Sequence, residues 1–185
     1  MKYLITLLTF AIGVYAVAQE TYTYANPDRD FYDGRELYIQ QKYPISAQYI
    51  EKFLNKREKH ADVDLVQEAK YYQACNAYKM RQEHAATLLS NYVKEYPYTP
   101  YLDQCHFMMG NIAFENKQYN LAMEEYRNVK IRRLQKDEKD LLRFNQGYCY
   151  MQKDEYAQAK GEFHNIKNGT SKYKNSACYF YSYCD

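Results

Sequence analysis

Aromatic and small residues recur along the chain with helical spacing. At five places an aromatic residue is followed three positions later by a small one. At the first four of these places a large residue also stands seven positions after the aromatic residue. Positions i, i+3 and i+7 lie on one face of an α-helix, so each place predicts a helix, here called the A helix. The five pairs are Phe31/Gly34, Tyr71/Ala74, Phe107/Gly110, Phe144/Gly147 and Tyr179/Ser182, spaced 40, 36, 37 and 35 residues apart.

A second pattern begins about twelve residues after each of the first four aromatic residues. It has mostly apolar side chains at offsets 0, 3, 7 and 10, which is again helical spacing and predicts a B helix. The four copies are Tyr43/Ser46/Ile50/Phe53, Gln82/Ala85/Leu89/Tyr92, Tyr119/Ala122/Tyr126/Val129 and Tyr156/Ala159/Phe163/Ile166. The chain therefore contains repeated helix pairs joined by tight turns, with a fifth A helix at residues 172–185.

The small residues of the A helices have a steric explanation. Gly34, Ala74, Gly110 and Gly147 carry little or no side chain, so they allow the B helix to approach closely. We expect each of these positions to lie at a contact between the A and B helices.

The combined pattern G-x8-Y-x2-A-x3-[YF] resembles the tetratricopeptide repeat. It is seen as Gly110/Tyr119/Ala122/Tyr126 and as Gly147/Tyr156/Ala159/Phe163, and the resemblance covers about residues 30–185. It implies an all-α fold, a right-handed α-solenoid of antiparallel helix pairs. The units would be about 30–60, 64–97, 101–135 and 138–168, with a partial fifth at 172–185. The long period is similar to that of repeats in Gram-negative envelope proteins.

The first residues have the form of a signal peptide. Lys2 precedes an apolar stretch that ends in Ala16-Val17-Ala18, which predicts cleavage after Ala18 and an exported protein. An uncleaved anchor is the alternative, although the stretch is short for a membrane span. The first cysteine is Cys75, so no lipoprotein-type cysteine follows the apolar stretch. We expect a signal peptide at 1–18, a polar lead-in at 19–29, no membrane span after cleavage, and a periplasmic, outer-membrane-associated or secreted protein.

Composition narrows the classes of partner. Lys and Arg number 25 against 23 Asp and Glu, so no broad basic surface is expected and nucleic-acid binding is not predicted. The chain has 24 Tyr, 6 Gly, 4 Pro and no Trp, which favours helices over a turn-rich β fold.

The resemblance also implies a partner-binding groove. In the tetratricopeptide family a concave groove is lined by the A helix, at the position three before the small residue and at those one and four after it. Here these positions hold Phe31, Arg35, Tyr38, Tyr71, Cys75, Tyr78, Phe107, Asn111, Phe114, Phe144, Tyr148 and Met151. Such an aromatic channel suits peptides or sugars. The alternative is that these rings pack neighbouring repeats together.

Motifs for catalysis or metal binding are not found in the sequence. The five cysteines form no C-x-x-C and the four histidines no H-E-x-x-H, and neither a Gly-rich phosphate loop nor a G-x-S-x-G occurs. We expect buried thiols without disulfides, no metal, no cofactor and no catalytic residues.

The function predicted from these features is a non-catalytic exported scaffold that binds a protein or peptide partner in the bacterial cell envelope. Two alternatives stay open: a glycan-binding or outer-membrane sugar-import accessory protein, and the docking arm of a longer protein. The apolar face of the fifth A helix would be covered by further chain, serve as a cap, or dock on a partner.

Overall fold

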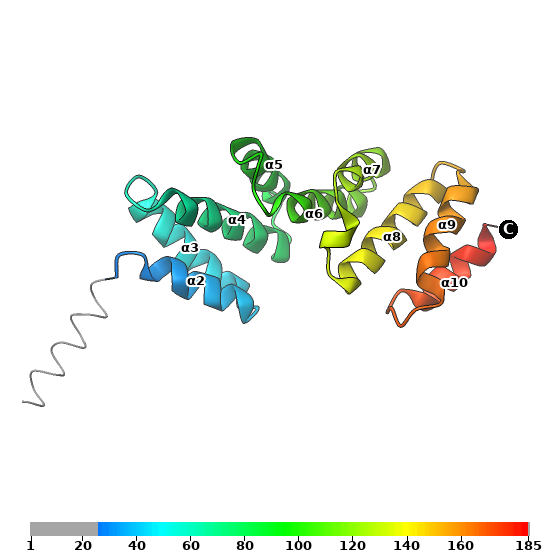
Figure 1. Ribbon diagram of the computed structural model, residues 1–185, viewed down its shortest axis with the longest axis horizontal. Helices are drawn as coiled ribbons and strands as arrows, with labels where there is room; N and C mark the ends of the chain where they lie inside the picture. Colours follow the sequence, from blue (N-terminus) through cyan, green and yellow to red (C-terminus); the bar gives the residue numbers. More distant parts are fainter. Residues whose placement is uncertain (1–25, 185) are drawn as a thin grey trace, which may run out of the picture. The chain divides into compact units, whose positions relative to one another are not determined.

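All regular secondary structure in the described part of the chain is helical. The computed structural model describes residues 26–184, except the side chain of Arg57, and contains nine α-helices, one short 3₁₀ helix and no strand in that range (Figure 1). The predicted all-α fold is confirmed over these residues. The elements are α2 (Arg29–Ile39), α3 (Tyr43–Arg57), α4 (Val63–Lys79), α5 (Ala85–Glu95), α6 (Leu102–Glu115), α7 (Tyr119–Arg127), η1 (Ile131–Arg133), α8 (Lys136–Met151), α9 (Tyr156–Lys167) and α10 (Lys174–Tyr183).

Two predicted segments lie wholly or mainly outside the described residues. These are the signal peptide at 1–18 and the lead-in at 19–29, of which only 26–29 are described. The chain divides into two compact units, Met1–Asn76 and Ala77–Asp185, so the boundary falls inside α4. They are called unit 1 and unit 2, and each is described by itself.

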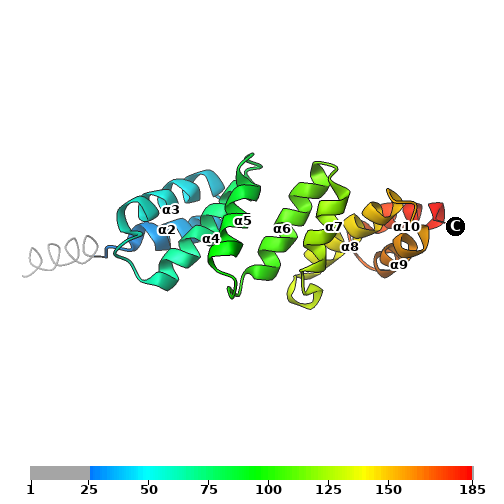
Figure 2. The ribbon, with the colours of Figure 1, turned by 90° about the horizontal axis from the view of Figure 1, so that it is seen from above.

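Neighbouring helices pack in succession within each unit. In unit 1, α2 packs against α3. In unit 2, α6 packs against α7, α8 against α9, and α9 against α10, while α8 also contacts both α6 and α7 (Figure 2). The A helices of the sequence pattern are therefore α2, α4, α6, α8 and α10, and the B helices are α3, α5, α7 and α9.

One turn geometry recurs after each of the first four A helices. The turns contain the four described non-glycine residues with positive φ: Gln41 (61°), Arg81 (55°), Lys117 (60°) and Asp154 (59°). Each stands seven residues after the small residue of its A helix. The next residue donates its N–H to a carbonyl five positions back, for example Gln118 N to Ala113 O at 2.8 Å. This is the hydrogen bond of a Schellman motif, which ends a helix through one left-handed residue.

The glycines of the A helices face bulky side chains of the B helices. A methyl group added at Gly147 would lie 2.8 Å from ring atoms of Phe163, and one at Gly110 would overlap the ring of Tyr126. At Gly34 the neighbour is Ile50. The filling residue stands sixteen positions after the glycine in all three cases, and the predicted close approach is confirmed there.

These filling residues form the centres of the cores. Ile50 lies in unit 1 with Phe31 and Phe53, all fully buried. Tyr126 and Phe163 belong to two clusters in unit 2. Apolar burial of this kind is the main favourable term in folding.

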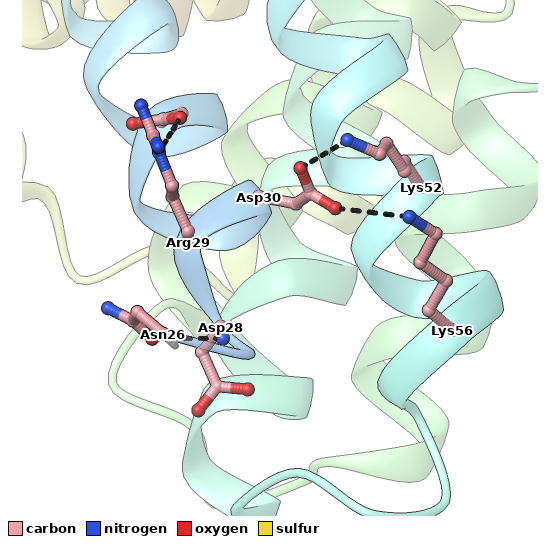
Figure 3. Close-up of polar contacts among 7 residues, drawn as sticks. Asn26, Asp28, Arg29, Asp30, Lys52 and Lys56 are labelled. Atoms are coloured by element: carbon pink, nitrogen blue, oxygen red, sulfur yellow. Dashed lines mark hydrogen bonds and ion pairs between the residues drawn. The ribbon is translucent and has the colours of Figure 1, made fainter. Parts of the chain in front are cut away.

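Polar contacts made by side chains fix how neighbouring helices are oriented against each other. In unit 1, Asp30 of α2 lies between two lysines of α3, with Lys52 Nζ at 2.6 Å and Lys56 Nζ at 3.8 Å (Figure 3). In unit 2, the buried Asp103 accepts a hydrogen bond from Lys130 N at 2.6 Å and pairs with Arg133 Nη1 at 2.8 Å. Asp103 thereby ties the segment around η1 to α6.

Candidate partner-binding surface

Three of the predicted groove residues are core residues. Phe31, Phe107 and Asn111 are 0%, 4% and 3% exposed, so their side chains do not reach a surface. Cys75, at the equivalent position in α4, is buried too. For these four residues the structure corrects the expectation of a groove lining, because their side chains are buried among the packed helices.

The other eight predicted residues are half-buried. All four residues at the position four after the small residue belong to this group, so this position is half-buried in each of the first four A helices. The eight are Arg35, Tyr38 and Tyr71 in unit 1, and Tyr78, Phe114, Phe144, Tyr148 and Met151 in unit 2.

In unit 2, half-buried rings form a continuous row. Tyr148 of α8 lies 5.6 Å from Phe114 of α6, 6.0 Å from Tyr119 at the start of α7 and 5.7 Å from Phe180 of α10, measured between ring centroids. Phe114 and Tyr119 are themselves 5.9 Å apart. We call these four residues the aromatic row. It joins three successive A helices through one central tyrosine.

Two members of the row were missed by the sequence prediction. The sequence pattern assigns Tyr119 to a B helix, and Phe180 does not stand at one of the three groove positions. A usable signal existed for Tyr119, because Tyr43, Tyr119 and Tyr156 all stand at the first position of a B helix.

Unit 1 has a smaller aromatic group. Tyr38 lies 5.3 Å from Tyr43 and 5.0 Å from Tyr72, and burial raises the pKa of its hydroxyl, as does its hydrogen bond with Cys75. Arg35 stands over the ring of Tyr32 at 5.5 Å and is 3.8 Å from the carboxylate of Glu68.

A buried polar network lies within unit 2. Asn111 Nδ2 donates to the Tyr78 hydroxyl at 3.1 Å, and the Tyr126 hydroxyl donates to Asn111 Oδ1 at 2.9 Å. Asn145 Nδ2 donates to Asn111 Oδ1 at 3.1 Å and to the Tyr126 oxygen at 2.9 Å. Burial raises the pKa of Tyr126 and of Tyr78, so both hydroxyls remain protonated at neutral pH. The network connects α4, α6, α7 and α8.

Two pockets lie along the turns of unit 2. The first, of about 470 Å³, lies between the turn after α4 and the end of α6. The second, of about 390 Å³, lies between the turn after α6 and the end of α8, and Tyr119 of the aromatic row lines it. We call these two the turn-edge pockets. The sequence patterns describe only the faces of helices, so they do not indicate pockets formed by turns.

The five cysteines, all within the described residues, differ in their burial. None of the five cysteines forms a disulfide; Cys75, Cys105 and Cys149 are buried, but Cys178 is exposed and Cys184 half-buried, which corrects the expectation of burial for the last two. Burial raises the pKa of Cys149 to about 12, so its thiol is protonated at neutral pH. His106 Nδ1 lies 2.7 Å from Glu125 Oε2 and links α6 to α7.

No group of three or more His, Cys, Asp or Glu side chains in residues 26–184 could hold a metal ion. No helix in that range combines the length and the apolar character needed to cross a membrane.

No protein-family model matches the chain, and no curated protein matches it either.

Proposed function

We propose that the chain is a non-catalytic scaffold that binds a protein or peptide partner in the bacterial cell envelope. The observation that carries this proposal is the aromatic row of Phe114, Tyr119, Tyr148 and Phe180, in which four half-buried rings follow one another across three successive A helices. Aromatic side chains of this kind are enriched in protein interfaces, because they bury much area with little loss of rotamer freedom.

The proposed architecture is a right-handed solenoid of antiparallel helix pairs like that of the tetratricopeptide family. Three recurrences support it. The small residue recurs with a period of 35 to 40 residues, the left-handed turn follows the first four of them by seven, and at three glycines the filling residue follows by sixteen. Independent packing of unrelated helices would not be expected to keep these offsets.

The proposed location follows from the sequence of the first eighteen residues. Their charge, apolar stretch and Ala16-Val17-Ala18 ending are typical of a signal peptide. N-terminal sequencing of the protein recovered from the periplasm tests this: a first residue of Gln19 supports export with cleavage, and an intact Met1 contradicts it.

The binding proposal is tested by capturing partners from a bacterial envelope extract on the immobilised full chain and on Tyr148→Ala. This substitution removes the central ring of the aromatic row. We expect a specific envelope protein to elute from the wild type and to be lost from the variant.

A destabilised control separates binding from folding. Leu89→Val alters a fully buried side chain of α5, a helix of the same unit that supplies no member of the row, and it costs about 1 kcal/mol of stability. Capture retained by Leu89→Val and lost by Tyr148→Ala supports the proposal. Equal capture by both variants, or no specific protein on the wild type, contradicts it.

A further inference from the structure

The two turn-edge pockets of unit 2 occupy equivalent places in consecutive repeats. Each is lined on one side by the left-handed turn residue and its followers, beginning with Arg81 in the first pocket and Lys117 in the second. On the other side each is lined by residues five and six after the next small residue, Glu115 and Asn116 in the first and Gln152 and Lys153 in the second. The repeat therefore places two similar pockets next to each other along one edge.

Side-chain amides line both pockets. They are exposed, and none makes a hydrogen bond to another residue of the described range 26–184. A carboxamide both donates and accepts, so a series of them can pair with the N–H and C=O groups of an extended peptide backbone. The five amides are Gln82 and Asn116 in the first pocket and Gln118, Asn120 and Gln152 in the second.

The second pocket combines positive charge with apolar area. Lys117 and Lys153 are exposed, and none of the described residues lining the pocket is acidic. The neighbouring carboxylate of Asp154 already accepts a hydrogen bond from the Tyr156 hydroxyl at 2.9 Å. Leu121 is 45% exposed and adds apolar surface to this lining.

The first pocket is balanced in charge. Arg81 Nη2 lies 3.9 Å from Glu115 Oε1, and both side chains are more than half exposed, so the pair adds little stability. Lys79 and Glu83 add one charge of each sign. Selection by charge is therefore expected at the second pocket and not at the first.

From this placement we infer that the turn edge of unit 2 binds an extended peptide carrying an acidic side chain next to an aliphatic one. The carboxylate lies between Lys117 and Lys153, and the aliphatic group packs on Tyr119 and Leu121. The amides of the two pockets hold the peptide backbone. This inference rests on the proposed function, because Tyr119 also belongs to the aromatic row.

Fluorescence anisotropy of labelled peptides with the full chain tests the inference. The probes are an eight-residue peptide of alternating Glu and Val, whose β-branched residues favour an extended chain, and the same peptide with Lys in place of Glu. We expect the acidic peptide to bind and the basic one not to. The double variant Lys117→Gln/Lys153→Gln should weaken binding by about tenfold, since each exposed charge contact contributes up to about 1 kcal/mol.

A matched control removes two other exposed positive charges of unit 2. Lys94→Gln/Arg127→Gln changes the net charge equally, so it should leave the affinity within about twofold of the wild type. Equal weakening in both variants, equal binding of both peptides, or no binding at 1 mM peptide overturns the inference. If that happens while envelope capture still depends on Tyr148, the proposed function stands and only the peptide class is wrong.

Discussion

The two units share the same packing within their helix pairs but differ in their polar interiors and in their aromatic surfaces. In unit 1 the ring of Tyr38 packs against Tyr43, and in unit 2 the ring of Phe114 packs against Tyr119, at the same positions of the repeat. At the position one after the small residue, the next A helix then supplies Cys75 in unit 1 but Tyr148 in unit 2, although Tyr72 of the same helix adds one ring beside Tyr38 in unit 1. The cysteine is buried, whereas the tyrosine extends the rings to α10.

The polar interiors differ in the same way. In unit 1 the Ser46 hydroxyl donates to Gly34 O at 2.7 Å and accepts from Asn76 Nδ2 at 2.9 Å, which leaves the buried Asn76 Oδ1 without a partner in the described structure. In unit 2 the network around Asn111 is closed by several hydrogen bonds. The comparison shows that the repeat determines backbone and packing, while single positions decide whether a unit has a continuous aromatic surface.

The largest expected effect comes from breaking the closed network. Asn111→Ala removes the acceptor of Tyr126 and Asn145 and the donor to Tyr78, so we expect unit 2 to lose about 2–4 kcal/mol of unfolding free energy. Asn76→Ala removes one hydrogen bond and one unpaired oxygen together, so the loss in unit 1 should be about 1 kcal/mol. Amide hydrogen exchange of each unit in the full chain measures both, and a larger loss for Asn76→Ala would refute the comparison.

The next effect tests the contact between helices at the glycines. Gly147→Ala should destabilise unit 2 by about 1–3 kcal/mol, because the new methyl group would meet the ring of Phe163. Gly161 of α9 has open space around it, so Gly161→Ala should stabilise by about 0.5–1 kcal/mol through helix propensity. Chemical denaturation gives both values, and the same sign for the two variants would contradict the packing described.

A pH effect of about 1 kcal/mol is expected from the buried thiol of Cys149. Its pKa is raised from 9.0 to about 12, so the folded state holds the proton more tightly and its stabilising contribution is complete below pH 9. Between pH 9 and 10 this one group should lower the free energy of unfolding by about 1 kcal/mol. The buried tyrosines, whose pKa values are also raised, add to the loss at higher pH.

Urea titrations of the wild type and of Cys149→Ala at pH 8, 9 and 10 measure this contribution. The variant should lose less stability over that range than the wild type. Parallel pH profiles for the two proteins would show that Cys149 does not contribute.

The smallest effect concerns the left-handed turns. A non-glycine residue in the left-handed conformation costs about 1–2 kcal/mol of stability, which a glycine would avoid. Glycine also has greater conformational freedom in the unfolded chain, and this entropy reduces the net gain. Lys117→Gly should therefore stabilise unit 2 by about 0.5–1 kcal/mol, and Gln41→Gly should do the same in unit 1. Thermal denaturation checks both variants, and a loss of stability in either would mean that its turn is not left-handed in solution.

Sequence patterns were sufficient for the helices and their internal contacts. The sequence predicts the contacts at Gly34, Gly110 and Gly147 because only a very small residue allows Ile50, Tyr126 or Phe163 to come so close. The exposure of the A-helix positions was not predictable in this way. Spacing alone does not distinguish Phe107, which is buried, from Phe144, which stacks at 5.3 Å on Tyr173 in the segment before α10.

The pockets and the network were missed for a different reason. The network depends on side chains that come together from separate repeats, such as Asn111 and Asn145. The pockets depend on turn residues that share no side-chain chemistry. Only their offset of seven from the small residue links Arg81 and Lys117. A search for equal offsets, and not for equal residue types, would have found these turns.

The most direct measurement is site-specific photo-crosslinking in cells. The photoreactive amino acid p-benzoyl-phenylalanine replaces Tyr148 in the aromatic row or, as the control, the exposed Gln158 of α9. The account predicts a discrete crosslinked partner from position 148 and none from position 158. Crosslinks of equal yield at both positions, or none at position 148 in a protein that is folded and expressed, would contradict the claim that the aromatic row binds a partner.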